Sequence, residues 1–302
     1  ELNNLGVRVG RLEDRVGNVK VTGDMRLRYL GAQEKNGHYV TADGDYSKHS
    51  KFDARARVQF NAKVNDRTEA VVRMTSGDFE LGDASSTASA SIDRAYVNHK
   101  FGERVSVKAG RFDQTIGNGL IYDDGFDGVQ FNAGNDKVNF QAAYGYAIKG
   151  DTFKTLNQDK NPELVVANLS GKVGKHANVG GFYTRVNGED FKTAATATPA
   201  AKAYKNIYGF NTDFNFDKVW VGGEWLKASN VAKSQAWVAG VGYGNYNQAK
   251  QGTWDVKAQY FNQKENSPIF SSTWNHIYDA NSKGWMATVD YALHNNVGLS
   301  AY

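Results

Sequence analysis

The chain has 302 residues, of which 40% are hydrophobic, with a mean hydropathy of −0.58 and a formal net charge of +4. No run of 18 apolar residues occurs, which excludes a membrane-spanning helix, whereas a β-barrel gives only a weak hydropathy signal because its inward residues are polar. The basic residues are not clustered as in nucleic-acid-binding proteins, so no nucleic-acid partner is expected.

Residues 1–18 differ from the rest of the chain. Apolar residues recur there at alternating spacings of three and four, the a and d positions of a heptad repeat. This pattern predicts the end of a coiled-coil stalk, with a short amphipathic helix capping the following domain as the alternative. The predicted seam consists of Leu2, Leu5, Val9, Leu12 and Val16.

From residue 19 onward the sequence alternates apolar and polar residues with the period of a β-strand. In the first predicted strand, about 19–29, Val21, Met25 and Leu27 share one face, and Asp24 and Arg26 lie on the other. The second, about 51–64, and several later stretches follow the same pattern, often with aromatic residues at both ends of the apolar face. A soluble sheet would also alternate in this way.

The connections between strands separate the two possibilities. Long and short connections alternate along the whole chain, which is typical of a transmembrane barrel with long loops at one rim and tight turns at the other. The long ones are 31–50, 77–90, 112–124, 149–162, 187–203, 228–234 and 263–283, and the short ones lie near 65–66, 102–103, 134–136, 174–176, 217, 247–251 and 294–296.

We therefore predict an all-β fold, a transmembrane antiparallel β-barrel occupying residues 19–302, with a helical stub at 1–18. About 14 complete strands can be counted, and Val297, Leu299 and Ala301 begin another. Because such barrels usually have an even number of strands, we expect 16, with part of the fifteenth and all of the sixteenth absent from this sequence. The short turns define the periplasmic rim, which places the stub in the periplasm.

Charged residues indicate a candidate pore constriction. Inward positions of the first strands carry arginines, and neighbouring strands are close enough for these to form a basic wall. The third long connection carries four aspartates, which would oppose that wall if the connection folded inward. The alternative is that the arginines are solvated lumen residues and the aspartates lie on the surface. The wall comprises Arg26, Arg28, Arg55, Arg57, Arg73 and Arg94, and the acids are Asp113, Asp123, Asp124 and Asp127. The parity of Arg111 points it outward unless a bulge intervenes.

No catalytic residues, cofactor or metal site are predicted. The six histidines are scattered without the pairs used in zinc sites, and the "DDGFDG" stretch lacks the ligand spacing of a calcium loop. Glycines 240, 242 and 244 alternate on a strand with no helix after them, unlike a dinucleotide-binding motif.

The heptad stub running into "GNVKVTGDMRLRY" resembles the OmpM-type outer-membrane porins of diderm Firmicutes. The stretch "IDRAYVNHKFGERVSVKAGRFDQTIGNGL" is similar to the region around the constriction loop of trimeric general porins. The resemblance implies a homotrimer in the outer membrane, in contact with its lipid and lipopolysaccharide. It also implies tethering to the cell wall by an upstream surface-layer-homology domain that this chain does not contain.

The sequence thus predicts a passive diffusion channel for small hydrophilic solutes and ions, with no enzymatic activity. The arginine surplus suggests mild anion preference, unless the acids dominate the narrowest point. The alternatives are a substrate-specific channel of the oligosaccharide type, for which inward Trp220 and Phe261 could serve, a soluble extracellular glycan-binding β-protein, and a β-barrel enzyme.

Overall fold

The computed structural model describes residues 17–31, 50–149, 161–188, 191–193, 202–274 and 281–302. The seam residues Leu2, Leu5, Val9, Leu12 and Val16 lie outside them, so the coiled coil stays a prediction. In the described part of the chain, no helix is apolar and long enough to cross a bilayer.

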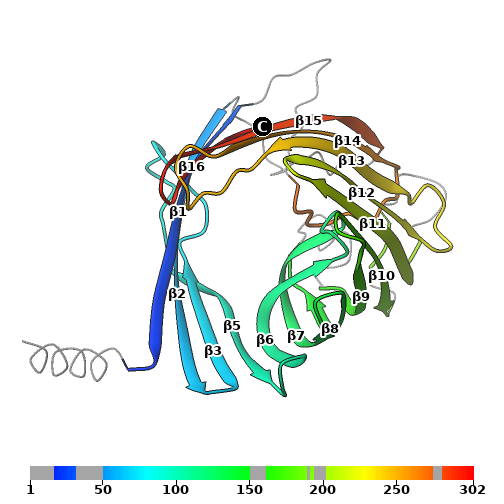
Figure 1. The fold of residues 1–302 in the computed structure, drawn as a ribbon, viewed down its shortest axis with the longest axis horizontal. Helices are drawn as coiled ribbons and strands as arrows, with labels where there is room; N and C mark the ends of the chain where they lie inside the picture. The colour runs from blue at the N-terminus through cyan, green and yellow to red at the C-terminus, as the bar shows by residue number, and fades with distance from the viewer. Residues whose placement is uncertain (1–16, 32–49, 150–160, 189–190, 194–201, 275–280) are drawn as a thin grey trace, which may run out of the picture.

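Sixteen strands form a single antiparallel sheet that curves into a ring around a central opening (Figure 1). Each long strand pairs with the next along the chain, whereas the two-residue β4 pairs with β2 beside the main path, so that β3 pairs with β5. β1 and the short β16 stand at the two ends of the strand order. The strands are β1 Val19–Gly31, β2 Ser50–Asn65, β3 Thr68–Thr75, β4 Phe79–Glu80, β5 Ser91–Lys100, β6 Val105–Ile116, β7 Tyr122–Gly134, β8 Val138–Ala147, β9 Glu163–Val173, β10 Ala177–Asn187, β11 Asn206–Phe216, β12 Val219–Ala228, β13 Ala236–Gly244, β14 Trp254–Gln263, β15 Ser282–His294 and β16 Val297–Ala301. The predicted all-β, antiparallel barrel fold is confirmed.

The outer face of the ring is apolar and exposed. In β15, the exposed Trp285, Val289 and Tyr291 alternate with the half-buried Thr288 and Asp290. Aromatic residues of adjacent strands touch at both ends of this face: ring centroids are 5.0 Å apart for Tyr260–Trp285 and 6.1 Å apart for Tyr243–Trp254. An aliphatic middle between two aromatic rows is the pattern of a barrel surface that meets lipid.

The inner face is not polar throughout, as the sequence analysis had assumed. Inward positions of β9 to β14 are apolar and completely buried at many places, for example Leu164, Ile207 and Leu226. They pack against Ile116, Leu120 and Ile121 at the tip of the β6–β7 hairpin, whose strands curl inward (Figure 1). The hydrophobic core of the protein therefore lies inside the ring, on one side of it.

The predicted third long connection, 112–124, is wrong. β6 and β7 pair without interruption from Val105 opposite Ala133 to Ile116 opposite Tyr122, which leaves only residues 117–121 as the turn. Alternating residues such as Phe112 and Phe126 are buried on one face of the hairpin, so strand pairing continues beyond the barrel wall. The four candidate acids consequently lie on strands and not in a loop.

Glycines permit this inward course. Gly110 in β6 and Gly128 in β7 are directly opposite each other, and Gly110 has a φ of 126°. A Cβ atom at Gly110 would lie 2.3 Å from the carbonyl oxygen of Ala95, and one at Gly128 would lie 2.0 Å from that of Tyr144. Only glycine fits so close an approach of backbones, so the two positions fix where the hairpin leaves the wall.

The two faces of β15 give the first prediction. Val289→Arg places a charge on the exposed apolar face, which the sequence predicts to contact lipid, and should lower the free energy of unfolding by about 2–4 kcal/mol. Thr288→Arg, one residue away on the inner face, should lower the free energy of unfolding much less, because its charge reaches water. Reversible urea unfolding in lipid vesicles measures both, and equal costs for the two variants would contradict the assignment of faces.

Candidate functional site

A bulge in β5 brings two charged residues to the inner face together. The register between β3 and β5 shifts between Arg73 opposite Arg94 and Met74 opposite Ile92, which leaves Asp93 as the extra residue. Asp93 and Arg94 can therefore both point toward the interior, although they are adjacent in sequence. The sequence analysis missed Asp93 because strict alternation places it on the opposite face from Arg94.

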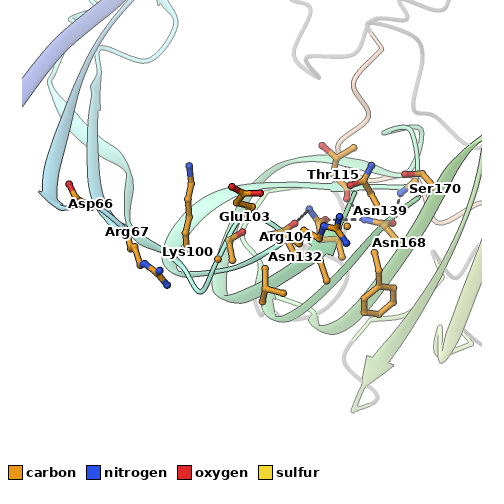
Figure 2. Close-up of a pocket in the computed structure, with 18 residues that line it drawn as sticks. Asp66, Arg67, Lys100, Glu103, Arg104, Thr115, Asn132, Asn139, Asn168 and Ser170 are labelled. Carbon is orange, nitrogen blue, oxygen red and sulfur yellow. Dashed lines mark hydrogen bonds between the residues drawn. The ribbon is translucent and has the colours of Figure 1, made fainter. Parts of the chain in front are cut away.

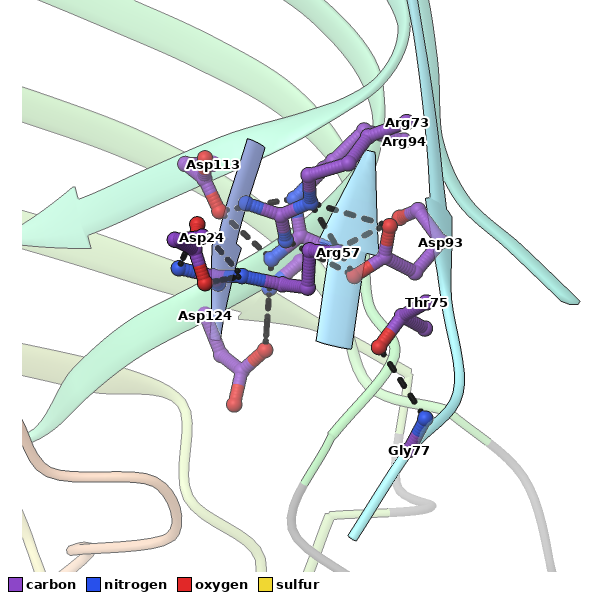
Figure 3. A network of polar contacts seen from close by, with 10 residues as sticks. Asp24, Arg57, Arg73, Thr75, Gly77, Asp93, Arg94, Asp113 and Asp124 are labelled. Carbon is purple, nitrogen blue, oxygen red and sulfur yellow. Dashed lines mark hydrogen bonds and ion pairs between the residues drawn. The ribbon is translucent and has the colours of Figure 1, made fainter. Parts of the chain in front are cut away.

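These residues belong to a network of ion pairs across β1, β2, β3, β5 and the hairpin (Figure 3). Arg57 binds Asp24 through two nitrogens, with Nε 2.9 Å from Oδ1 and Nη2 2.9 Å from Oδ2. Arg73 binds Asp93 in the same two-pronged manner, at 3.0 and 2.7 Å. Such bidentate pairs hold the guanidinium groups in fixed orientations.

Arg94 connects the wall to the hairpin. Its Nε donates to Oδ1 of Asp113 at 2.7 Å, and its Nη2 lies 3.6 Å from Oδ1 of Asp124. The side chain of Arg94 is only 7% exposed, whereas that of Asp113 is 60% exposed. Asp113 therefore presents a carboxylate to the interior while its position is fixed by a buried cation.

The remaining wall arginines lie on β1 and β2. Arg28 Nη2 is 2.8 Å from Oδ2 of the buried Asp53, and Arg26 Nη2 is 2.6 Å from Oδ1 of Asp78. Arg55 stands directly opposite Arg26 in the register, and among the described residues it forms no ion pair. Five of the predicted wall arginines are thus paired with aspartates, three of them on the same strands, one between β3 and β4 and one on the hairpin, and Arg55 is the exception among the described residues.

The four predicted acids separate into two groups. Asp113 and Asp124 reach Arg94, as described above. Asp123 accepts a hydrogen bond from Thr115 Oγ1 at 2.9 Å, and Asp127 pairs with Arg111 at 2.6 Å. The structure does not bring Asp123 and Asp127 to the arginine network. They share the face of the hairpin that carries Asp113 but lie opposite Thr115 and Arg111 in the register, on either side of the Asp113 position.

A buried carboxylate anchors the tip of the hairpin, and the sequence analysis did not identify it. Glu224 of β12, 4% exposed, accepts hydrogen bonds from the backbone N–H groups of Asn118 at 2.6 Å and Leu120 at 2.8 Å. On β9, the side-chain oxygen of Asn168 accepts the N–H of Gly117 at 2.9 Å. An acidic residue among apolar inward positions on its strand was the signal that could have indicated this role.

Part of the last long connection also folds inward. Tyr122 and Ser271 form a parallel bridge, and Asp123 donates its N–H to the Ser271 carbonyl at 2.7 Å. The Tyr122 and Phe270 rings stack at 4.7 Å, and Ser271 Oγ donates to Asp124 at 3.0 Å. The hairpin tip is therefore clamped from two directions, by the inner wall and by residues 269–274.

A polar cavity of about 860 Å³ lies between the hairpin and the short-turn rim (Figure 2). Thr115 and Gly117 of the hairpin line it, together with Asn139 and Gln141 of β8 and Asn168 and Ser170 of β9. Arg67 and Arg104 contribute from the turns, and Lys100 from the end of β5. Solute-sized polar cavities of this kind are candidates for binding sites.

Two further predicted residues are accounted for. Trp220 donates from Nε1 to Asp213 at 2.9 Å, and Lys257 Nζ lies 5.2 Å from the centre of its ring, so Trp220 does face inward. Phe261 is 6% exposed within the core and offers no stacking surface to a solute.

Within the described ranges, no group of three or more His, Cys, Asp or Glu residues is arranged to hold a metal ion.

Comparisons with known proteins agree with this architecture. Residues 32–163 match the sequence model of a family described as "Putative porin". The fold is similar to solved structures of porin mutants from Rh. blastica, one at a TM-score of 0.59 and 13% identity, covering 93% of this chain and 92% of that one. A triple mutant of the Rhodopseudomonas blastica porin (TM-score 0.58, 14% identity) and a chain titled "Asymmetric conductivity of engineered proteins" (0.57, 14%) have the same coverage. No curated protein matches the sequence. At these identities the likeness shows the fold, a porin-type barrel.

The Glu224 anchor gives the second prediction. Glu224→Ala removes the acceptor of two backbone N–H groups in the hairpin tip, and each unpaired buried donor costs about 1–3 kcal/mol. We expect a lower thermal midpoint in detergent and increased open-channel noise in bilayer recordings. Glu224→Gln keeps one acceptor oxygen, so its thermal midpoint should lie between those of the unaltered protein and Glu224→Ala. An unchanged midpoint in Glu224→Ala would show that the hairpin does not depend on this contact.

Proposed function

We propose that this chain forms an outer-membrane diffusion channel through which small hydrophilic solutes and ions pass passively, and that it acts as a channel and not as an enzyme. The observation that carries the proposal is the hairpin folded into the ring, packed against β9 to β14 and joined to the neighbouring strand β5 by the Arg94–Asp113 pair. An inward-folded segment narrows a barrel without closing it when apolar packing confines it to one side. The apolar outer face, the porin-type fold and the family match over residues 32–163 support this function.

The charge arrangement supports a weakly selective channel. Five of the six wall arginines have aspartate partners within 3 Å, so most of their field is cancelled locally. Among the described residues Arg55 forms no ion pair, and it stands beside Arg26 and Arg57. We propose that Arg55 sets a mild preference for anions, and that the paired residues act mainly by fixing the shape and hydrogen-bonding surface of the passage.

Assembly and tethering remain sequence-based parts of the proposal. The heptad seam from Leu2 to Val16 supports a homotrimer whose stub projects into the periplasm. An attachment to the cell wall would require an upstream domain outside this chain. The lipid-facing surface would contact outer-membrane lipid and lipopolysaccharide.

The third prediction tests the channel and its selectivity together. Purified protein inserted in a planar bilayer should give stepwise increases of KCl conductance, and Arg55→Gln should move the zero-current potential in a KCl gradient toward cation preference. The reason is that this change removes the predicted wall arginine that forms no ion pair within the described residues.

The matched control removes a whole pair. The double variant Asp24→Asn with Arg57→Gln deletes a cation and an anion at the same level of the wall, so the potential should remain close to that of the unaltered protein. If the pair deletion shifts the zero-current potential as strongly as Arg55→Gln, paired arginines and aspartates do not cancel each other's field, and this part of the proposal is wrong. If no conductance appears with correctly folded protein, the channel function itself is wrong.

A further inference from the structure

The cavity on the short-turn side of the hairpin has a wall built from side-chain amides. Four of them form a closed cycle of hydrogen bonds: Gln130 donates to Gln114 at 2.7 Å, Gln114 to Gln141 at 2.7 Å, Gln141 to Asn132 at 2.9 Å, and Asn132 to Gln130 at 2.9 Å. Gln114 and Gln130 are buried beneath the cavity, and Asn132 and Gln141 line it. The cycle fixes every amide orientation before any solute arrives.

Hydrogen-bonding capacity remains on the cavity side of this cycle. Each amide nitrogen carries two hydrogens, and Asn132 and Gln141 each use only one within the cycle. Asn139 and Ser170 stand opposite each other on β8 and β9, line the same cavity, and have no side-chain partner among the described residues. Fixed donors and acceptors close together match hydroxyl groups, which donate and accept at once.

Cations stand at the mouth of the same cavity. Arg67 and Arg104 line it from the turns between strands and Lys100 from the end of β5, and none of the three forms an ion pair within the described part of the chain. Of the two acids there, Asp66 is already engaged by Lys63 at 3.4 Å, which leaves Glu103 as the opposing charge. The mouth therefore carries a net positive charge and can receive a carboxylate.

We infer that this cavity binds a small polyhydroxylated carboxylate, with the carboxylate at Lys100 and Arg104 and the hydroxyl groups at the amide wall. The volume of about 860 Å³ holds such a solute with its water. The inference rests on the proposed channel function, because it makes the cavity a binding step on the path from the short-turn rim. The solute class follows from the two kinds of group in the cavity. The amides alone would select for hydroxyl groups and the cations alone for a carboxylate, so only both together favour a solute that carries both.

The test uses current block in planar bilayers with three probes: glucuronate, glucose and propionate. Glucuronate has both hydroxyls and a carboxylate, and each control probe lacks one of them. We expect glucuronate, added on the short-turn side, to block at least about tenfold more tightly than either control, since each additional set of contacts contributes on the order of a tenfold change. The chain contains no cysteine, so Lys218→Cys at the same rim reports the orientation of each channel through an impermeant thiol reagent.

Two variants separate the contributions. Lys100→Gln with Arg104→Gln should abolish the advantage of glucuronate over glucose, whereas Gln141→Leu, which opens the amide cycle, should abolish its advantage over propionate. Lys218→Gln, a cation of the same rim that does not line the cavity, should leave block by glucuronate unchanged. KCl conductance of each variant checks that it folds and inserts.

The outcomes are distinct. Equal block by glucuronate and propionate would overturn the amide contribution, and equal effects of Lys218→Gln and the double variant would overturn the cationic mouth. Normal KCl conductance without block by any probe would mean that the cavity is only a hydrated vestibule, which overturns this inference and leaves the channel function standing. Absence of KCl conductance would instead overturn the channel function on which the inference rests.

Discussion

The docking of the β6–β7 hairpin against the inner wall is the contact on which the other features of the interior depend. Glu224 accepts two backbone hydrogen bonds from the tip, and apolar residues surround the one from Leu120. Losing the acceptor would leave the buried N–H group of Leu120 unpaired, which costs more than the hydrogen bond itself contributes. The hairpin is thereby held at one place, and Asp113 is presented at a defined distance from Arg94.

The location of the core follows from the same contact. A barrel that only encloses water needs no apolar inward residues, yet β9 to β14 carry many. Burial of these side chains against Phe112, Ile116 and Leu120 stabilises the hairpin in the interior through the hydrophobic effect. Because this packing occupies the β9–β14 side, the open part of the ring lies against β1 to β5, where the ion pairs are. Packing on one side thus determines which wall a solute meets.

Much of this could be predicted from the sequence, for identifiable reasons. Alternation in segments such as 51–64 gave strand boundaries close to those of β2. What failed were features that depend on contacts between distant segments. The inward position of Asp93 depends on the bulge in β5. The role of Glu224 depends on the tip of a hairpin that lies about a hundred residues earlier in the chain. Acids such as Asp24 were visible one by one, but their pairing with particular arginines depends on register, which alternation alone does not give.

The hairpin also links the two polar regions of the interior. Asp113 belongs to the ion-pair network, whereas Thr115 and Gly117, only two and four residues further along the same strand and turn, line the amide cavity. A segment fixed at its tip cannot move one of these positions without the other, because the ladder between β6 and β7 is continuous through both. The width of the passage at the ion-pair network and the shape of the amide cavity are therefore coupled mechanically. Any change that weakens the hydrogen bonds between Glu224 and the hairpin tip should alter the passage width and the cavity shape together. Charge changes on β1 and β2 should alter the ion-pair network alone.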